Sequence, residues 1–199
     1  MTIDEQDLEQ EKKPAYIFKI CLIGNGGVGK TCIARRLCFD TFDANTKLTI
    51  GIDFYTYDVP IIINGEESFL RLSIWDFGGQ EQFRKFFLYY LSGANGIFLV
   101  FSLVNIQTLV MLDWWYEKLQ EYGHQNTPRI IVATKNDLIH KQEENTKIDD
   151  LVVDRFLMRH NEKDFIKTSS KDNYNIEFSF KKLVEKVLNY YNFHYDRIK

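Results

Sequence analysis

The sequence lacks the features that would place the protein outside an ordinary globular fold. No apolar run approaches the roughly 20 residues that a membrane-spanning helix needs. The three cysteines are an odd number without the paired spacing of metal ligands, so we expect reduced, mostly buried thiols. No basic block stands out and the net charge is −3, which excludes the electrostatic footprint of a nucleic-acid-binding protein.

Recognisable membrane anchors are missing as well. Residue 2 is threonine rather than the glycine that myristoylation requires, and residues 193–199 hold no cysteine for prenylation. The first residues do not read as a signal peptide. We therefore expect a cytoplasmic monomer without an intrinsic lipid anchor, recruited to membranes only through partners.

Length and composition favour one folded unit. The chain has 199 residues, 45% of them apolar and 27% charged, as in common globular proteins. Residues 1–14 are acidic, polar and poor in apolar residues, so we expect a mobile tail followed by one domain over 15–199.

The clearest motif is a phosphate loop. Residues 24–31 fit the pattern G-x-x-x-x-G-K-[ST]: Gly24, Asn25, Gly26, Gly27, Val28, Gly29, Lys30 and Thr31. Glycines let the backbone curl so that N–H groups converge on phosphate oxygens, at the positive end of a following helix. Lys30 would reach the outer phosphates, and the Thr31 hydroxyl would bind Mg²⁺. The pattern predicts a strand before the loop and a helix after it.

Strand-like and helix-like segments alternate along the chain. The apolar periodicity predicts strands at 16–23, 52–63, 68–75, 96–101, 129–134 and 164–168, and helices at 32–41, 83–90, 106–122, 149–160 and 176–195. Asn64-Gly65 marks a hairpin turn. We therefore expect an α/β fold with about six strands, mostly parallel with one antiparallel strand, and about five helices covering both faces. Ligands of such sheets bind at the carboxyl ends of the strands, where each suggestive cluster falls.

Five motifs in order make residues 16 to about 195 resemble the Ras superfamily of small GTPases, whose fold is the phosphate-loop small G domain. The first is the phosphate loop. The others are Thr49 in Thr-Ile-Gly-Ile-Asp-Phe, Asp76-Phe-Gly-Gly-Gln80, Thr134-Lys-Asn-Asp137 and Ser169-Ser-Lys171. The resemblance implies that the protein is a molecular switch that binds GTP or GDP with Mg²⁺ and slowly hydrolyses GTP to GDP and phosphate.

The resemblance also assigns residues to the base. A carboxylate on Asp137 can accept both the ring N–H and the exocyclic amine of guanine, which adenine does not offer. The Lys135 stem would lie over the base, and the Ser170 N–H would contact the guanine oxygen. Thr134 replaces a commoner asparagine, and we expect a looser tie to the phosphate loop. The remaining nucleotide-binding positions that the resemblance implies are Cys32, Phe42, Thr49, Gly79, Ser169 and Lys171.

For hydrolysis, the resemblance implies catalytic roles for Gln80, Lys30, Gly79 and Thr49, and metal binding by Thr31, Thr49 and, through water, Asp76. Gln80 would orient the attacking water, and the Gly79 N–H would sense the terminal phosphate. No arginine occurs in residues 43–48, and Lys47 reads as a solvated loop lysine. We therefore expect slow turnover that depends on an activating protein, because a finger supplied in trans adds roughly 10³ to 10⁵ in rate.

The residues leave alternatives open on three points: the activity, the branch of the family and the role of three aromatic side chains. The chain could be a GTP-held scaffold with negligible hydrolysis, or a phosphate-loop ATPase or kinase, which Asp137 argues against. Its branch is mixed, since the segment from Thr49 resembles Rab proteins whereas Trp75-Asp-Phe-Gly-Gly-Gln80 resembles the Arf, Gα and Roc type. Phe54, Trp75 and Tyr90 match an aromatic surface for effectors, or simply pack the hairpin and helix. An exchange factor, an activating protein and effectors are the implied partners.

Overall fold

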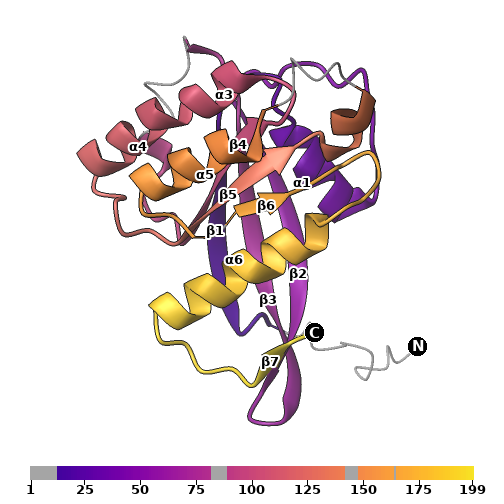
Figure 1. Ribbon diagram of the computed structural model, residues 1–199. Coiled ribbons are helices and arrows are strands. Elements are labelled where there is room, and N and C mark those ends of the chain that lie inside the picture. The colour runs from indigo at the N-terminus through magenta and orange to yellow at the C-terminus, as the bar shows by residue number, and fades with distance from the viewer. Residues whose placement is uncertain (1–12, 82–88, 142–147, 164) are drawn as a thin grey trace.

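The computed structural model describes residues 13–81, 89–141, 148–163 and 165–199, and a seven-stranded sheet in the order β6-β5-β4-β1-β3-β2-β7 forms its centre (Figure 1). The strands are β1 (Tyr16–Ile23), β2 (Ile52–Ile63), β3 (Glu66–Phe77), β4 (Gly96–Ser102), β5 (Arg129–Thr134), β6 (Phe165–Lys167) and β7 (Arg197–Ile198). The helices within the described ranges are α1 (Lys30–Phe39), α3 (Ile106–Val110), α4 (Leu112–Glu121), α5 (Asp150–Arg159) and α6 (Ile176–Tyr190), with a 3₁₀ helix, η1 (Asn136–Lys141).

The predicted fold class is confirmed. β1 lies between β3 and β4 and pairs with both in parallel, and β5 and β6 extend the parallel sheet. β2 runs antiparallel to both of its neighbours, β3 and β7, so it is the one antiparallel strand that the sequence predicts. The strand beyond the expected six is β7, which is only two residues long.

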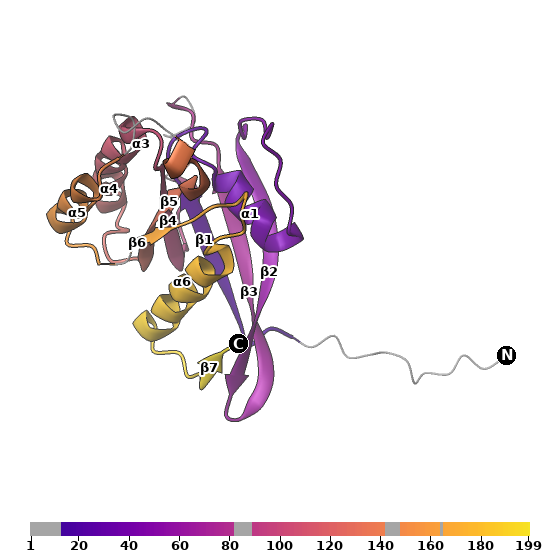
Figure 2. The same ribbon diagram turned by 45° about the vertical axis from the view of Figure 1, so that its right-hand side comes forward.

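Helices cover both faces of the sheet (Figure 2). Alternate residues of β1 explain the layering: Phe18, Ile20 and Leu22 pack toward α1 and α6, whereas Cys21 and Ile23 pack toward α3, α4 and α5. The central strands are thus buried on both sides, as their apolar runs predict. This packing leaves the carboxyl ends of the parallel strands, and the loops that follow them, exposed together at one end of the sheet.

The hairpin turn forms as predicted. Asn64 and Gly65 both have positive φ, 52° and 79°, as a two-residue turn between twisted strands requires. The helix expected at 106–122 is interrupted at Met111, although this residue keeps helical dihedrals and its amide still donates to the Gln107 carbonyl. The last helix ends at Tyr190 rather than at 195.

Some expectations fall outside the described residues. The tail predicted for 1–14 lies there except for its last two residues, and so does most of the helix predicted at 83–90. All three cysteines are free thiols, but only Cys21 is fully buried, with Cys32 and Cys38 half-buried. Burial raises the pKa of Cys21 to about 12 and that of Cys38 to about 11, so both stay protonated at neutral pH. Within the described ranges, every helix is too short or too polar to span a bilayer.

The segment after α6 folds back onto the sheet. Asn192 turns the chain with a φ of 55°, and the ring of Phe193 then lies 4.3 Å from that of Tyr16 and 5.6 Å from that of Phe18, centroid to centroid. The backbone amides of Asp196 and Lys199 donate to carbonyls of β2, at 2.8 and 2.9 Å. Among the aromatic residues near the end of the chain, Phe193 and Tyr195 pack against the core, whereas Tyr190 and Tyr191 are exposed.

Phe193→Ala is expected to lower the free energy of unfolding by about 2 kcal/mol, because it removes a half-buried ring that fills the gap beside Tyr16 and Phe18. Urea unfolding measures this loss. Tyr190→Ala is the matched control, since that exposed ring should cost less than about 1 kcal/mol. Equal losses in the two variants would show that Phe193 does not anchor the segment.

Candidate nucleotide-binding site

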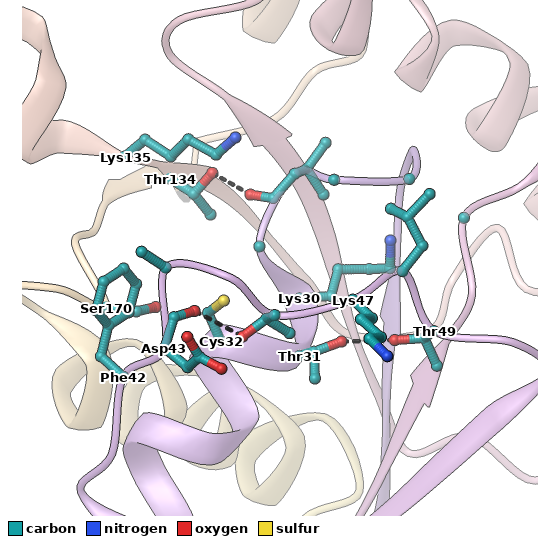
Figure 3. Close-up of a pocket in the computed structure, with 18 of the residues that line it drawn as sticks. Lys30, Thr31, Cys32, Phe42, Asp43, Lys47, Thr49, Thr134, Lys135 and Ser170 are labelled. Atoms are coloured by element: carbon teal, nitrogen blue, oxygen red, sulfur yellow. Dashed lines mark hydrogen bonds between the residues drawn. The ribbon is translucent and has the colours of Figure 1, made fainter.

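A pocket of about 390 Å³ opens at the carboxyl ends of β1, β3 and β5 (Figure 3). Its wall comes from the phosphate loop, the start of α1, the segment 42–49, the end of β3, the β5–η1 junction and residues 170–171. The predicted site residues in the wall are Gly26, Gly27, Val28, Gly29, Lys30, Thr31, Cys32, Phe42, Thr49, Gly79, Gln80, Thr134, Lys135, Asp137, Ser170 and Lys171. Gly24, Asn25, Asp76 and Ser169 stand behind this wall and contact its residues.

The phosphate loop is shaped by glycines that other residues could not replace. Gly24 has a φ of 145°, and a β-carbon there would lie 2.1 Å from the Val100 carbonyl oxygen of β4. Gly29 has a φ of 104° and forms the N-cap of α1. The Lys30 side chain is 5% exposed, and its ammonium donates to the carbonyls of Gly24 and Asn25 at 2.8 and 2.7 Å. The loop thus curls around a buried positive charge, an arrangement that suits anions.

Three oxygen-bearing side chains from separate segments meet beside the loop. The Thr31 hydroxyl oxygen lies 2.7 Å from that of Thr49 and 2.5 Å from Oδ2 of Asp76, and Thr49 lies 3.2 Å from the same carboxylate oxygen. Asp76 is fully buried, and its Oδ1 has no hydrogen-bond partner among the described residues. Burial raises the pKa of Asp76 above its usual value, and the nearby Lys30 charge opposes that rise.

This oxygen cluster fits Mg²⁺. Hard oxygen donors are the ligands that this ion prefers, and Mg²⁺ commonly keeps waters through which a carboxylate is reached. A buried carboxylate oxygen without a partner is costly unless a cation or a water satisfies it. Asp76 thus has the chemistry expected of a residue that holds the metal through water.

The two glycines after Phe77 let the chain that follows β3 pass close to the phosphate loop and to the segment around Thr49. The Gly78 amide donates to the Gly51 carbonyl at 2.9 Å. A β-carbon on Gly79 would lie 2.2 Å from the backbone of Asn25 and Gly26, so only glycine allows this approach. Gln80 follows in the pocket wall, in the same wall as Gly26 and Gly27.

The opposite end of the pocket carries the predicted base-reading residues. The Ser169 hydroxyl donates to Oδ1 of Asp137 at 2.8 Å and orients the carboxylate. Thr134 keeps a tie to the phosphate loop, because its hydroxyl oxygen lies 2.5 Å from the Val28 carbonyl oxygen and 3.0 Å from that of Phe101. That this tie is looser than an asparagine would make it stays a prediction. A short threonine reaches the loop because β5 runs close beneath it.

Two residues escaped the sequence reasoning. Arg36, on α1, donates to the Ser170 carbonyl at 2.7 Å across 134 positions, and no local pattern signals such a contact. The δ2 carbon of Leu48 lies 3.7 and 3.9 Å from the points where a β-carbon would stand on Gly26 and Gly27. Apolar atoms therefore lie over the phosphate loop. In the sequence, the only indication that Leu48 lines the pocket is that it precedes Thr49.

Phe54, Trp75 and Tyr90 form a contiguous aromatic surface on the outer part of the sheet. The Phe54 and Trp75 rings meet edge to face at 4.7 Å, and Trp75 lies 6.4 Å from Tyr90. The Lys19 ammonium lies 3.6 Å from the centre of the Trp75 ring and donates to the Tyr90 carbonyl at 2.6 Å. Phe54 and Tyr90 are 62% and 50% exposed, whereas rings that only pack the hairpin and the helix would be mostly buried.

Comparison with known proteins agrees with this geometry. A model of the Ras family matches residues 19–189. The chain belongs to the Ras family. It is a Rab-like small GTPase, a guanine-nucleotide-binding switch of the trafficking and signalling type, and the predicted enzyme class is confirmed.

The small GTPase is similar to Rab and Ypt proteins of several organisms. It is 31% identical over 174 residues to Ras-related protein Rab-1A of Dictyostelium discoideum, covering 87% of this chain and 82% of the relative. It is 34% identical over 181 residues to Ras-related protein RABA5a of Arabidopsis thaliana, with 91% and 78% covered. GTP-binding protein ypt1 of Schizosaccharomyces pombe is 31% identical over 165 residues, with 83% and 77% covered.

Proposed function

We propose that this GTPase binds GTP and GDP together with Mg²⁺, hydrolyses GTP slowly, and changes partner affinity with the state of the terminal phosphate. The observation that carries the proposal is the oxygen cluster of Thr31, Thr49 and Asp76, which joins α1, the segment around Thr49 and β3 at distances of 2.5–3.2 Å. Segments held at one point by a phosphate and its metal separate when that phosphate is lost. The segments around Thr49 and Gln80 are therefore the moving parts.

Each side chain of the cluster has a proposed task. Thr31 and Thr49 would ligate Mg²⁺ directly and Asp76 through water. When bound, Mg²⁺ neutralises charge on the two outer phosphates. The Lys30 ammonium adds a second positive charge at the loop, and the Gly79 N–H donates to the terminal phosphate. Gln80 holds the attacking water in line, so catalysis consists of positioning and charge stabilisation.

The base would lie at the Asp137 end of the pocket. The carboxylate accepts the two guanine donors, the Lys135 stem and the Phe42 ring flank the base, and the Ser170 N–H donates to the guanine oxygen. The 2.8 Å hydrogen bond from Ser169 keeps the Asp137 carboxylate in place before the nucleotide arrives. Preorganised acceptors discriminate strongly against ligands that lack the matching donors.

We further propose that the aromatic surface of Phe54, Trp75 and Tyr90 binds effectors in the GTP state. Phe54 on β2 and Tyr90 are exposed, whereas Trp75 on β3 is half-buried between them. The surface lies near the moving segments. An activating protein would supply a cation in trans, since residues 43–48 contain no arginine.

Single-turnover hydrolysis of GTP tests the proposal. Wild-type protein should hydrolyse slowly, and Gln80→Leu should be slower by about tenfold or more at unchanged GTP affinity, because the attacking water loses its orientation. Gln107→Leu, on an exposed position of α3, is the control and should match wild type.

The alternative is a scaffold that holds GTP without meaningful hydrolysis. Leu48 favours it, because its apolar side chain covers the phosphate loop at Gly26 and Gly27, in the same pocket wall as Gln80. If wild type and Gln80→Leu showed the same negligible rate while both bound GTP, the scaffold would be the better description.

A further inference from the structure

Arg36 lies on the last turn of α1, behind the pocket wall, and its side chain is only 13% exposed. Its Nε donates to the Ser170 carbonyl at 2.7 Å, and its Nη2 reaches the Lys171 carbonyl at 3.4 Å. Its Nη1 donates to the carbonyl and to Oδ1 of Asp40, at 2.8 and 2.9 Å. The guanidinium therefore bridges the end of α1 and the loop 169–174.

Asp40 extends this bridge. It caps α1 with a φ of 50°, and its amide donates to the Arg36 carbonyl. Its carboxylate accepts from Arg36 and from Nδ2 of Asn173 at 3.3 Å, so the loop is held to α1 at a second point. Within the loop, Ser169 and Tyr174 exchange backbone hydrogen bonds of 3.1 and 2.8 Å. The loop is thus closed on itself and fastened to the helix that begins at the phosphate loop.

The Ser170 amide lies between two of these anchors. Ser169, on one side, is hydrogen-bonded to Tyr174 through its backbone and to Asp137 through its hydroxyl. The Ser170 carbonyl, on the other side, is bonded to Arg36. Fixing both neighbours of one peptide N–H removes the conformational entropy that its ordering would cost when a ligand binds.

We propose that Arg36 is a positioning residue for guanine: by binding the Ser170 carbonyl it fixes the backbone of Ser170, so that the N–H of the same residue meets the base oxygen. The inference rests on the proposed nucleotide site and adds to it a residue outside the pocket. A hydrogen bond from a charged donor to a carbonyl is stronger than a neutral one, which suits a fixed anchor. Arg36 also links the guanine loop to α1, so the two ends of the pocket share one support.

The test is the rate of GDP release from the 199-residue chain, measured by displacement of a fluorescent GDP. Arg36→Met keeps the bulk of the side chain but removes its donors, and release should be about tenfold faster. Arg36→Lys keeps one charged donor and should fall between Arg36→Met and wild type. Arg35→Met is the matched control, because the neighbouring Arg35 hydrogen-bonds to Tyr55 instead, and its release rate should be that of wild type.

A second ligand separates positioning from general loosening of the structure. The diphosphate of 6-thioguanosine keeps both donors for Asp137 but carries sulfur, a weak acceptor, in place of the base oxygen. Arg36→Met should therefore accelerate its release by only about twofold. Equal acceleration with both ligands, or GDP release at the wild-type rate, would overturn the inference. Failure of wild-type protein to bind GDP at all would instead overturn the proposed function.

Discussion

Asp137→Asn is expected to reverse the base preference of the pocket, with GDP affinity falling by about 10³-fold and xanthosine diphosphate becoming the better ligand. The carboxylate accepts two donors from guanine, whereas the asparagine amide offers one acceptor and one donor. Xanthine carries a carbonyl where guanine has its amine, so the new amide N–H finds an acceptor there. Competition binding of the two diphosphates to wild type and variant measures the change.

Asp43→Asn is the matched control for this exchange. Asp43 also lines the pocket, but its carboxylate accepts from the Asn45 amide at 2.8 Å, and the base preference should stay that of wild type. If ATP competed as well as GTP for the wild-type protein, Asp137 would not read guanine. The chain would then bind nucleotides by its phosphate loop alone.

Gly79→Ala is expected to abolish the close contact between the end of β3 and the phosphate loop without abolishing GDP binding. The added β-carbon would lie 2.2 Å from the backbone of Asn25 and Gly26, so the end of β3 must withdraw from the phosphate loop. The N–H that meets the terminal phosphate moves with it, and loss of such a donor costs about 10²-fold in rate. Single-turnover GTP hydrolysis, beside GDP affinity, measures the two effects separately.

Gly51→Ala controls for the loss of a glycine in this region. Gly51 has a φ of 78°, so alanine is strained there, but its β-carbon would have open space around it. It should cost about 1 kcal/mol in stability and leave hydrolysis within a few-fold of wild type. Wild-type hydrolysis by Gly79→Ala would show that this glycine does not lie against the loop during the reaction.

The parts of the molecule that could be predicted are those that depend on short, local patterns of residues. Glycine spacing marks the phosphate loop, period-two alternation marks the hairpin, and continuous apolar runs mark β4 and β5. Motifs that follow strands fall at the same end of a parallel sheet, which is why Thr31, Thr49 and Asp76 could be expected together. The structure places them within hydrogen-bonding distance.

The rest depends on contacts between distant residues. β7 is too short to carry a periodicity and exists because it pairs with Ile61 and Ile62 of β2. The contact of Thr134 with Val28 depends on how closely β5 passes beneath the phosphate loop, which residue type alone does not fix. Arg36 reads as an ordinary helix arginine until the loop after β6 is placed beside it.

The position of β7, the last strand, determines which end of the domain faces a solid support when the protein is attached through its last residue. β7 pairs with β2 opposite the start of β3, at the amino ends of the parallel strands (Figure 1). The nucleotide pocket opens at their carboxyl ends. A dye, bead or solid support coupled through residue 199 would therefore stand at the far pole of the molecule from the nucleotide. Immobilised in that way, the protein would keep its pocket facing the solution, and exchange could be followed on the attached molecules.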